Sequence, residues 1–447
     1  MLSLSQARAA WCSAQGLTRA GNGAKNAVEV LSKHGLVRTL GGVDAYIALH
    51  ARLPALDAEK LHGDVRSSRL RVVPAARGCM YLVAAEHVPA ALRVAEQLSR
   101  ADTERTREKA GVKRGEYEKV AKHVLDTLAK HGPLGTDALR KALPPGAIRS
   151  LGEAGKKAGL SSTLPPALRL LEFRGEVERT LPEGRLDTER YLWRIATPAR
   201  GESDAERDDS SAFTELARVF FGAGALGTLE DFAEWSGLSQ REAREALAPL
   251  SLTGVEVEDA GDAKATWLAL PERVHELTST PDTTDAIAFL PFEDNLEALH
   301  GGVSRLVDPA HHATKVPSWG QKRPATLGTA RRMAWRTVMA EGRIVGFWEY
   351  DPDARDVVFA CFDRLSPEVR ERLAERAEAL GTFLREQVGH GRSFSLDTDD
   401  ALRERAARLR ASAHSAPPKR PTVPPRAAKT ASRRGRPRAP RAQPRAR

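Results

Sequence analysis

The sequence predicts an α+β protein with three tandem winged-helix (helix-turn-helix) domains, a small antiparallel β-domain with a C-terminal helix, and a disordered basic tail. Three observations favour this class. Helical patterns followed by two short β-rich runs occur three times along the 447 residues. Four apolar strand-like runs, separated by turn residues, come after them. At about 100–200 residues per domain, the chain is also long enough for several domains.

Residues 1–110 are expected to form the first winged helix and a long connecting helix. Apolar residues recur at helical spacing near 10–17, 27–35 and 44–53. Two β-rich runs follow, LRVVP and CMYLVA, and the turn at residues 75–78 between them indicates a hairpin. A charged helix from about residue 86 to residue 109 is expected next.

Residues 111–199 repeat this order as the second winged helix. Helices are expected over 116–130, 136–142 and 163–174. The segments EVERT and RYLWRI, with a turn at 182–185 between them, are expected to form two strands and a wing.

A polar, acidic linker at 198–211 precedes the third winged helix, residues 211–275. The segment LEDFAEWSGLSQREAREALAPL indicates a helix, a glycine-containing turn and a second helix. Ser239 and Glu242 fit a capping box at the start of that second helix. The segment GVEVEDAGDAKATWLAL then predicts a hairpin.

Residues 283–390 are expected to form the β-domain and its helix. The predicted strands are AIAFLPF, WRTVMA, RIVGFWEY and DVVFACF, and the predicted helix covers 367–388, with another helix at 400–410. Residues 411–447 are rich in Pro, Ala and Arg without apolar periodicity, so we expect a disordered tail.

The net charge of +10 comes from this tail. Residues 416–447 contain eleven Lys or Arg and no Asp or Glu, so subtracting these eleven charges from +10 leaves −1 for the body. The high isoelectric point is therefore no argument that the folded body binds nucleic acid. Arginines spaced by Pro and Ala can follow phosphates in an extended chain, and Arg433, Arg434, Arg436 and Arg438 are tail candidates for nucleic-acid contact. A solubilising or RNA-binding tail is the alternative.

Several classes of protein and site are excluded by composition. No apolar run approaches the roughly 18–20 residues of a membrane span, and no signal peptide is recognisable, so we expect a cytoplasmic, nucleoid-associated protein without membrane contact. The three cysteines Cys12, Cys79 and Cys361 lie far apart, which argues against disulfides and zinc. The pair His311-His312 lacks a third ligand nearby, so no metal is expected.

The second winged helix carries the basic side chains that winged helices use on DNA, in the third helix and the wing. Arg and Lys neutralise phosphates, and Ser or Thr near a helix start can hydrogen-bond them. The alternative is a solvated face, because several glutamates (Glu172, Glu176, Glu178, Glu183 and Glu189) lie among these bases. The candidates for DNA contact are Lys156, Lys157, Ser161, Ser162, Thr163, Arg169, Arg174, Arg179, Arg185 and Arg190, with Arg194 beside them.

The order of these segments resembles the AlkZ/YcaQ-like winged-helix group of crosslink-repair and azinomycin-resistance DNA glycosylases. The resemblance runs from about residue 4 to residue 362. It implies three tandem winged helices and a C-terminal β-domain that cradle duplex DNA, and excision of bulky alkylated or crosslinked bases. The segments that carry it are AYIALHARLP, RGCMYLVAAEHVP, LRLLEFRGEVERT with RYLWR, LEDFAEWSGLSQREAREAL, FLPFEDN with VDPAHH, and EGRIVGFWEYDPD.

Family members resemble one another in a Gln-x-Gln or Gln-x-Asp motif shortly before the third helix of the first winged helix. These polar groups would position water and stabilise a cationic transition state. The corresponding stretch here, residues 34–44, contains no Gln. Its remaining polar candidates for a catalytic role are Arg38, Asp44 and His34. Asp44 is more simply the N-cap of its own helix, and Arg38 equally fits a phosphate contact.

These observations predict a monomeric protein that binds double-stranded DNA. It is either a DNA repair hydrolase, a glycosylase with a changed catalytic group, or a non-catalytic lesion binder. Hydrolysis would need no cofactor. A winged-helix transcriptional regulator is the alternative from another functional class. Such regulators usually dimerise, whereas this chain would already contain three winged helices without forming a dimer. A scaffold that binds nucleic acid only through its tail is the third possibility.

Overall fold

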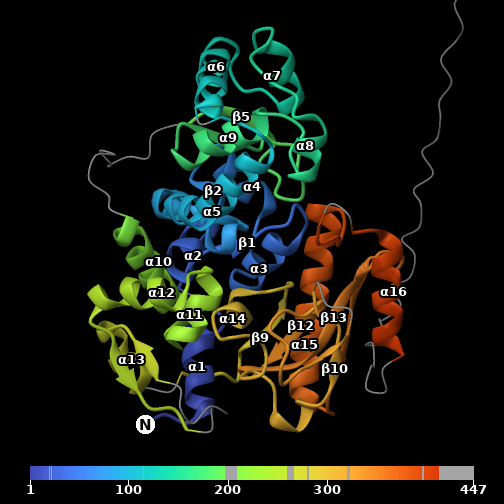
Figure 1. Cartoon of the computed structure of the whole chain (residues 1–447). Helices are drawn as coiled ribbons and strands as arrows, with labels where there is room; N and C mark the ends of the chain where they lie inside the picture. The colour runs from blue at the N-terminus through green and yellow to red at the C-terminus, as the bar shows by residue number, and fades with distance from the viewer. Residues whose placement is uncertain are drawn as a thin grey trace, which may run out of the picture. The chain divides into compact units, whose positions relative to one another are not determined.

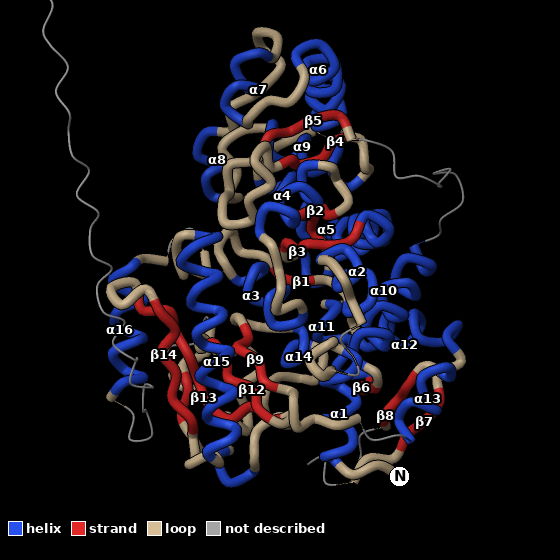
Figure 2. Tube along the Cα trace, turned by 180° about the vertical axis from the view of Figure 1, so that it is seen from behind, coloured by secondary structure: helices blue, strands red, loops and turns tan. Residues whose placement is uncertain are grey.

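The computed structural model describes residues 1–411 apart from residues 20, 22, 114, 197–208, 259–265, 279–280, 320–322 and 395–396. They form a mixed α+β structure with several small antiparallel sheets (Figures 1 and 2). The described part belongs to one compact unit, Met1–Ala416. None of its helices combines the length and apolarity needed to cross a bilayer. The expected linker and basic tail lie largely outside the described residues.

The three regions expected to form winged helices are called the first, second and third repeats. The first repeat contains α2 (Ala27–His34), β1 (Val37–Arg38) and α3 (Asp44–Arg52). A further helix, α4 (Ala58–Arg66), was not predicted. Few apolar residues mark it, and its start is fixed by the Asp57 side chain, which accepts hydrogen bonds from two backbone N–H groups.

The hairpin of this repeat forms as predicted. Strands β2 (Leu70–Pro74) and β3 (Met80–Ala84) pair antiparallel, and β1 adds to β3, so the sheet order is β1-β3-β2. Val37 faces Leu82 in this sheet. The pairing brings the segment after β1 to one edge of the hairpin, where the candidate site is found.

Helix α1 (Leu4–Ala14), predicted as the first helix of this repeat, packs elsewhere. Its Trp11 indole Nε1 donates to the Leu226 carbonyl at 3.2 Å and its ring stacks on Trp267 at 5.7 Å. Both partners belong to the third repeat. The three helices of the first repeat are therefore α2, α3 and α4.

The connecting helix α5 (Val88–Lys109) begins two residues later than predicted, with a proline in its first turn. In the second repeat, the predicted and observed ends of the main elements differ by two residues at most. Its sheet has only the pair β4-β5, and an additional short helix, α8 (Gly152–Lys157), precedes α9. The remaining elements are α6 (Glu116–His131), α7 (Thr136–Ala142), α9 (Leu164–Phe173), β4 (Val177–Thr180) and β5 (Leu192–Ile195).

The third repeat has the sheet order β6-β8-β7, which matches that of the first. Gly237 ends one helix with φ +84°, and Ser239 and Glu242 form the predicted capping box of the next. A helix that starts at Asp209 replaces the end of the expected linker. The elements are α10 (Asp209–Gly224), β6 (Leu226–Thr228), α11 (Leu229–Ser236), α12 (Gln240–Leu247), β7 (Thr253–Val255), β8 (Trp267–Ala269) and α13 (Pro271–Thr278).

The C-terminal region contains an open, four-stranded antiparallel sheet of order β14-β13-β12-β9, flanked by helices (Figure 1). All four predicted strands are present, and the helix predicted over 367–388 ends in a π-helical turn at 384–388. The elements are β9 (Ile287–Leu290), α14 (Asn295–Ala298), β10 (Lys315–Val316), β11 (Ala325–Thr326), β12 (Arg336–Ala340), β13 (Arg343–Asp351), β14 (Asp356–Cys361), α15 (Pro367–Phe383) and α16 (Asp399–Arg410).

The first repeat shares its hydrophobic cores with two neighbours. Tyr46 of α3 lies in one buried cluster with Trp348 of β13 and Phe383 of α15. Tyr81 of β3 lies in another with Trp235 of α11. The second repeat instead has a core of its own, between α6, α9 and its two strands. The second repeat meets the first where α9 packs on α5 and β4 lies beside β2, and where Leu181 and Leu186 join the first cluster. The cavity described below lies between these two repeats.

Candidate functional site

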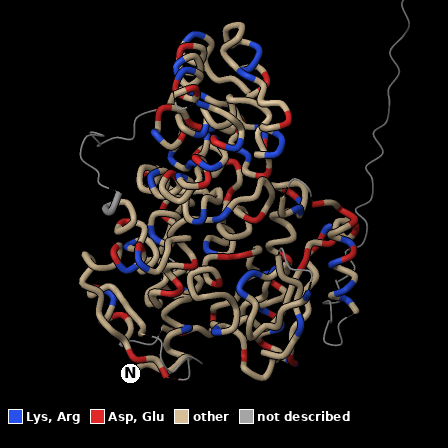
Figure 3. Tube along the Cα trace, in the orientation of Figure 1, with Lys and Arg blue, Asp and Glu red and all other residues tan. Residues whose placement is uncertain are grey.

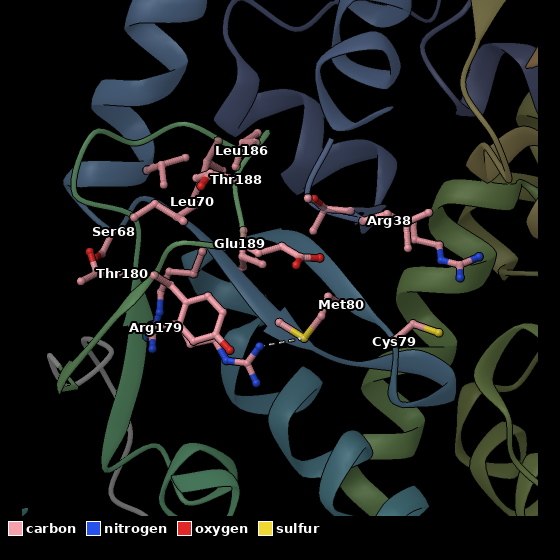
Figure 4. A pocket seen from close by; sticks show the side chains of 18 of the residues that line it. Arg38, Ser68, Leu70, Cys79, Met80, Arg179, Thr180, Leu186, Thr188 and Glu189 are labelled. Atoms are coloured by element: carbon pink, nitrogen blue, oxygen red, sulfur yellow. Dashed lines mark hydrogen bonds between the residues drawn. The ribbon is translucent and has the colours of Figure 1, made fainter. Parts of the chain in front are cut away.

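A cavity of about 540 Å³ lies between the first and second repeats (Figure 4). The first repeat contributes the segment after β1, strand β2 and the turn before β3, and the second contributes β4 and the loop that follows it. The residues that line the cavity are Arg38, Thr39, Leu40, Gly41, Val65, Ser68, Leu70, Arg71, Val72, Gly78, Cys79, Met80, Arg179, Thr180, Leu181, Leu186, Thr188, Glu189 and Tyr191.

The wall from the second repeat is the loop between β4 and β5, residues 181–191, which is anchored on the first repeat. The Leu186 N–H donates to the Tyr46 hydroxyl at 2.9 Å, and that hydroxyl is 2.8 Å from His62 Nε2. A Cβ on Gly184 would lie 2.2 Å from the His62 carbonyl oxygen, so only glycine allows this approach. The anchoring gives the cavity a fixed wall.

The arginines around the cavity are paired with buried carboxylates. Arg71 pairs with Glu178 at 2.6 Å, and Arg179 pairs with Glu172 at 2.9 Å. The Arg179 guanidinium also lies over the Tyr191 ring, 4.9 Å from its centroid. Burial raises the pKa of Glu172, although the Arg179 charge opposes that rise. Glu178 also pairs with Arg194 at 2.7 Å, so one carboxylate is shared by two arginines here.

Glu189 differs from Glu172, Glu176 and Glu178, three of the glutamates that the sequence grouped as a solvated face, whereas Glu183 is exposed as Glu189 is. The Glu189 side chain is exposed and extends among the residues labelled in Figure 4. No ion pair involves its carboxylate in the described part of the chain, whereas Glu172, Glu176 and Glu178 each face an arginine. A Cβ on Gly41 would lie 2.7 Å from the Glu189 Cγ, so this side chain lies directly against the segment after β1.

Arg38, a candidate for catalysis or phosphate contact, pairs with Glu293. Figure 4 shows its guanidinium directed away from the middle of the cavity. Glu293 is itself at φ +50°, and its carboxylate also meets Arg77 at 3.4 Å. Positive φ at a non-glycine residue carries a cost of order 1–3 kcal/mol. Glu293 therefore holds Arg38 in place from the far side of the cavity wall.

Asp44 is not the N-cap of its helix, as the sequence suggested. It is the first residue of α3, Val43 is the cap position, and no side chain caps this helix end. The Asp44 carboxylate is buried and accepts a hydrogen bond from Arg336 Nη2 at 3.3 Å. Burial raises its pKa to about 6, although Arg336 lowers it. The residue is thus enclosed beneath the C-terminal sheet and does not line the cavity.

His34 is also buried and does not line the cavity. Its Nδ1 lies 2.7 Å from the Ala14 carbonyl oxygen, which links α2 to α1. Burial lowers its pKa to about 4, despite the hydrogen bond to Ala14 that opposes this. The His34 imidazole is therefore neutral and hydrogen-bonded to the backbone in the interior, which is a structural role.

Segment 291–295, which joins β9 to α14, was not singled out for its chemistry. Besides Glu293 on Arg38, Asp294 accepts two hydrogen bonds from Arg52, at 2.7 and 2.9 Å. Asn295 Nδ2 donates to the Leu36 carbonyl at 2.6 Å. Three consecutive polar residues therefore fix the chain around β1, and their spacing in the sequence gave no signal of this.

Four of the proposed DNA-contacting bases are paired within the protein. Lys156 pairs with Glu153 at 2.7 Å and Arg174 with Glu118 at 2.5 Å. Arg179 is enclosed as described above. Arg185 pairs with Asp187 and donates to the Val388 carbonyl at 2.9 Å. The first two pairs are at the surface, where a phosphate can compete for the base; the last two are held in the wall of the cavity and its anchor.

Lys157, Arg169 and Arg190 are exposed and have no ion-pair partner in the described part of the chain. Ser161 is exposed too, whereas Ser162 and Thr163 are buried at the start of α9. Thr163 Oγ1 accepts a hydrogen bond from the Arg149 N–H at 3.1 Å, so it braces the preceding loop. Lys and Arg alternate with Asp and Glu over the second repeat (Figure 3). The tail candidates Arg433, Arg434, Arg436 and Arg438 lie outside the described residues.

The histidine pair has separate partners. His311 Nε2 lies 2.6 Å from Asp363, and His312 Nε2 lies 3.0 Å from the Ser304 carbonyl oxygen. Within the described ranges, no group of three or more His, Cys, Asp or Glu side chains is placed to hold a metal ion.

Comparisons with known proteins agree with this architecture. A family model described as DNA glycosylase AlkZ-like matches residues 42–383, which is more than half of the chain. The DNA glycosylase AlkZ of Streptomyces sahachiroi has a similar structure, with a TM-score of 0.65 and 19% sequence identity over 85% of this chain and 97% of that chain. No curated protein matches the sequence. The chain belongs to the AlkZ-like DNA glycosylase family.

Proposed function

We propose that the protein binds duplex DNA and releases bulky alkylated or crosslinked bases by hydrolysing the N-glycosidic bond in the cavity between the first two repeats. Membership of the AlkZ-like family implies DNA binding. The observation that carries the proposal is the wall of the cavity, because it includes residues 38–41. By the resemblance seen in the sequence, these residues belong to the stretch that would correspond to the family's catalytic motif. The volume of about 540 Å³ is within the usual range for ligand sites.

We interpret the three repeats as winged helices. Each has a helix, two further helices and a final antiparallel strand pair, and the sheets of the first and third have the same strand order. In the second repeat, Lys157, Arg169 and Arg190 supply unpaired positive charge for DNA phosphates. Their number is small, so we expect electrostatic binding by the body to be moderate and the tail to add to it.

The chemical character of the cavity suits a large, modified base. Val72, Met80 and Leu186 give it apolar surface, which favours burial of an alkyl adduct. Tyr191 supplies an aromatic ring in the wall, on which a base can stack. A base must leave the duplex to reach such a site, at a cost of a few kcal/mol, and a damaged base leaves most readily.

The test measures abasic sites in duplexes that carry N7-alkylguanine adducts or crosslinks, as strand breaks after mild base treatment. We expect the full chain to produce them. Val72→Trp, which fills the cavity, should abolish release and preserve DNA affinity. Ile195→Trp is the control, since Ile195 is an exposed apolar strand residue of the second repeat outside the cavity lining. Release that survives Val72→Trp would place the chemistry elsewhere.

A non-catalytic lesion binder is the second candidate. It is favoured because Arg38 is ion-paired, and Asp44 and His34 are buried away from the cavity. The same assay separates the two functions. Tight binding to adducted duplexes without any abasic sites would support the binder and contradict hydrolysis.

A further inference from the structure

We propose that the carboxylate of Glu189 is the catalytic group of this cavity: it stabilises positive charge on the sugar and accepts the proton of the attacking water. The inference rests on the proposed hydrolytic function. It assigns to a residue of the second repeat the catalytic role that the resemblance implies for Gln residues in the first repeat, where residues 34–44 contain no Gln.

The position of Glu189 is the first argument. Gly41 immediately follows the segment Arg38–Leu40, within the stretch that lacks the family's Gln motif. The Glu189 Cγ would be 2.7 Å from a Cβ on Gly41, and its Oε1 3.3 Å. The carboxylate therefore reaches the same part of the cavity wall from the opposite side. Gly41 has φ +75°, and the absence of a side chain there leaves room for Glu189.

Charge is the second argument. Glu189 is the one acidic residue among the described residues that line the cavity. Arg71, Arg179 and Arg38 are each paired with a carboxylate outside the lining, namely Glu178, Glu172 and Glu293. Glu178 is shared with Arg194 and Glu293 with Arg77, so these carboxylates are fully engaged by arginines. Glu189 is the lining carboxylate that no arginine pairs with in the described part of the chain. Beside apolar walls, such a charge favours a cation, and both an N7-alkylated purine and an oxocarbenium-like sugar are cationic.

The third argument is that the backbone around Glu189 is fixed. The Glu189 carbonyl accepts the Tyr191 N–H at 3.1 Å, and the Arg190 N–H donates to Thr188 Oγ1 at 3.1 Å. Two residues earlier, Asp187 pairs with His390 at 2.9 Å and with Arg185. Burial opposes ionisation of Asp187, but hydrogen bonds from His390 and Arg185 outweigh it and hold its pKa below the ordinary value. Electrostatic catalysis is favoured when the backbone that carries the carboxylate is fixed, and this loop meets that condition.

The reaction balances without a cofactor. The oxygen of water forms a bond to C1′ of the sugar as the C1′–N bond breaks, and the electron pair of that bond leaves with the base. A base that was cationic through N7-alkylation departs neutral. Glu189 takes one proton from the water and releases it to solvent, which leaves an abasic sugar with a hydroxyl on C1′.

The experiment compares Glu189→Gln with Glu183→Gln in the full chain. Glu183 is an exposed residue of the same loop, outside the cavity lining, so it controls for loss of a loop charge. Single-turnover release of N7-alkylguanine, DNA affinity and thermal unfolding are measured. A general base typically contributes 10²–10⁴-fold, so we expect release by Glu189→Gln to fall by at least about 100-fold, with affinity and unfolding unchanged.

A pH profile adds a readout that a structural role would not change. The wild-type rate should fall at acid pH as a carboxylate is protonated, and the residual rate of Glu189→Gln should lack that fall. If Glu189→Gln retains wild-type release, the inference is overturned and the proposed function stands. If the wild-type protein binds the adducted duplex and releases no base, the proposed function fails and the inference fails with it.

Discussion

Arg336 of β12 donates a hydrogen bond to Asp44 of α3 across 3.3 Å, and this buried contact joins the first repeat to the C-terminal sheet. The same guanidinium donates to Glu349 at 2.6 Å, to the Gly391 carbonyl at 2.7 Å and to Ser393 Oγ at 2.5 Å. One cation thus lies between two buried carboxylates. Glu349 has the shorter contact, and Asp44 retains one oxygen without a partner.

We expect the two sides of this contact to respond unequally to mutation. Arg336→Met leaves Asp44 buried without a cation and removes one of the two arginines that pair with Glu349, the other being Arg405, and should cost about 3–5 kcal/mol. Asp44→Asn should cost less than about 1 kcal/mol, because burial already raises the Asp44 pKa to about 6 and the amide oxygen can still accept from Arg336. Urea unfolding at pH 7 measures both, and equal costs would show that the Asp44 charge is essential to the contact.

The Asp44→Asn substitution should also change how the unfolding free energy depends on pH, in a direction set by the sign of the Asp44 pKa shift. The Asp44 pKa is raised from 3.8 to about 6 in the folded protein, so its contribution to stability is complete below about pH 4 and is lost as the pH rises through 6. Asp44→Asn has no such change. The difference in unfolding free energy between wild type and variant should therefore shift in favour of the variant between pH 4 and 6. A constant difference would contradict the assigned burial.

For His34, the expected dependence of the unfolding free energy on pH has the opposite direction. Burial lowers its pKa from 6.5 to about 4, so the unfolded chain binds the proton more readily in this interval. Stability is complete above pH 6.5 and falls as the pH drops toward 4, by up to about 3 kcal/mol at about 1.4 kcal/mol per pKa unit. His34→Gln should flatten the slope in urea unfolding from pH 7 to pH 4.5, and His131→Gln, at an exposed site, should not. His34→Gln should also retain base release, in contrast to a catalytic role.

Periodicity and turn residues predicted most helices and strands. Capping boxes and glycine turns act within a few residues, so Ser239 and Gly237 could be identified from sequence alone. Helix α1 shows the limit: its apolar face was recognised, but its partner Trp267 is more than 250 residues away. Helix α4 was missed because its start depends on the Asp57 side chain rather than on a long apolar pattern.

The candidate site was less predictable because charge pairs are tertiary. Arg185 and Arg190 look alike in the sequence, yet one is held by Asp187 and a distant carbonyl while the other is exposed. Glu189 belonged to a set of glutamates that all suggested a solvated face. Only the packing of its loop against Gly41 separates it from Glu172 and Glu178, which are buried against arginines.

The difference between Arg190 and Arg185 predicts their effects on DNA binding. If Arg190 neutralises one phosphate, Arg190→Ala should reduce the slope of log K against log salt by about 1. Arg185→Ala should leave the slope unchanged and lower thermal stability, since it removes one of the two partners of Asp187 and a contact to Val388. Binding titrations between 50 and 200 mM salt measure the slopes. An equal reduction in both variants would mean that Arg185 leaves Asp187 when DNA binds.

Removal of the basic tail should also change the slope of log K against log salt. A chain that ends at His414 lacks all eleven basic residues of 416–447, so its salt slope should fall by several, up to a limit of about 10 if every charge meets a phosphate. Single-turnover base release at saturating protein should not change, because the residues that line the cavity lie before the tail. An unchanged slope would show that the tail makes no contact with DNA phosphates. Complete loss of DNA affinity would instead favour a scaffold that binds nucleic acid only through its tail, and would contradict DNA contact by the second repeat.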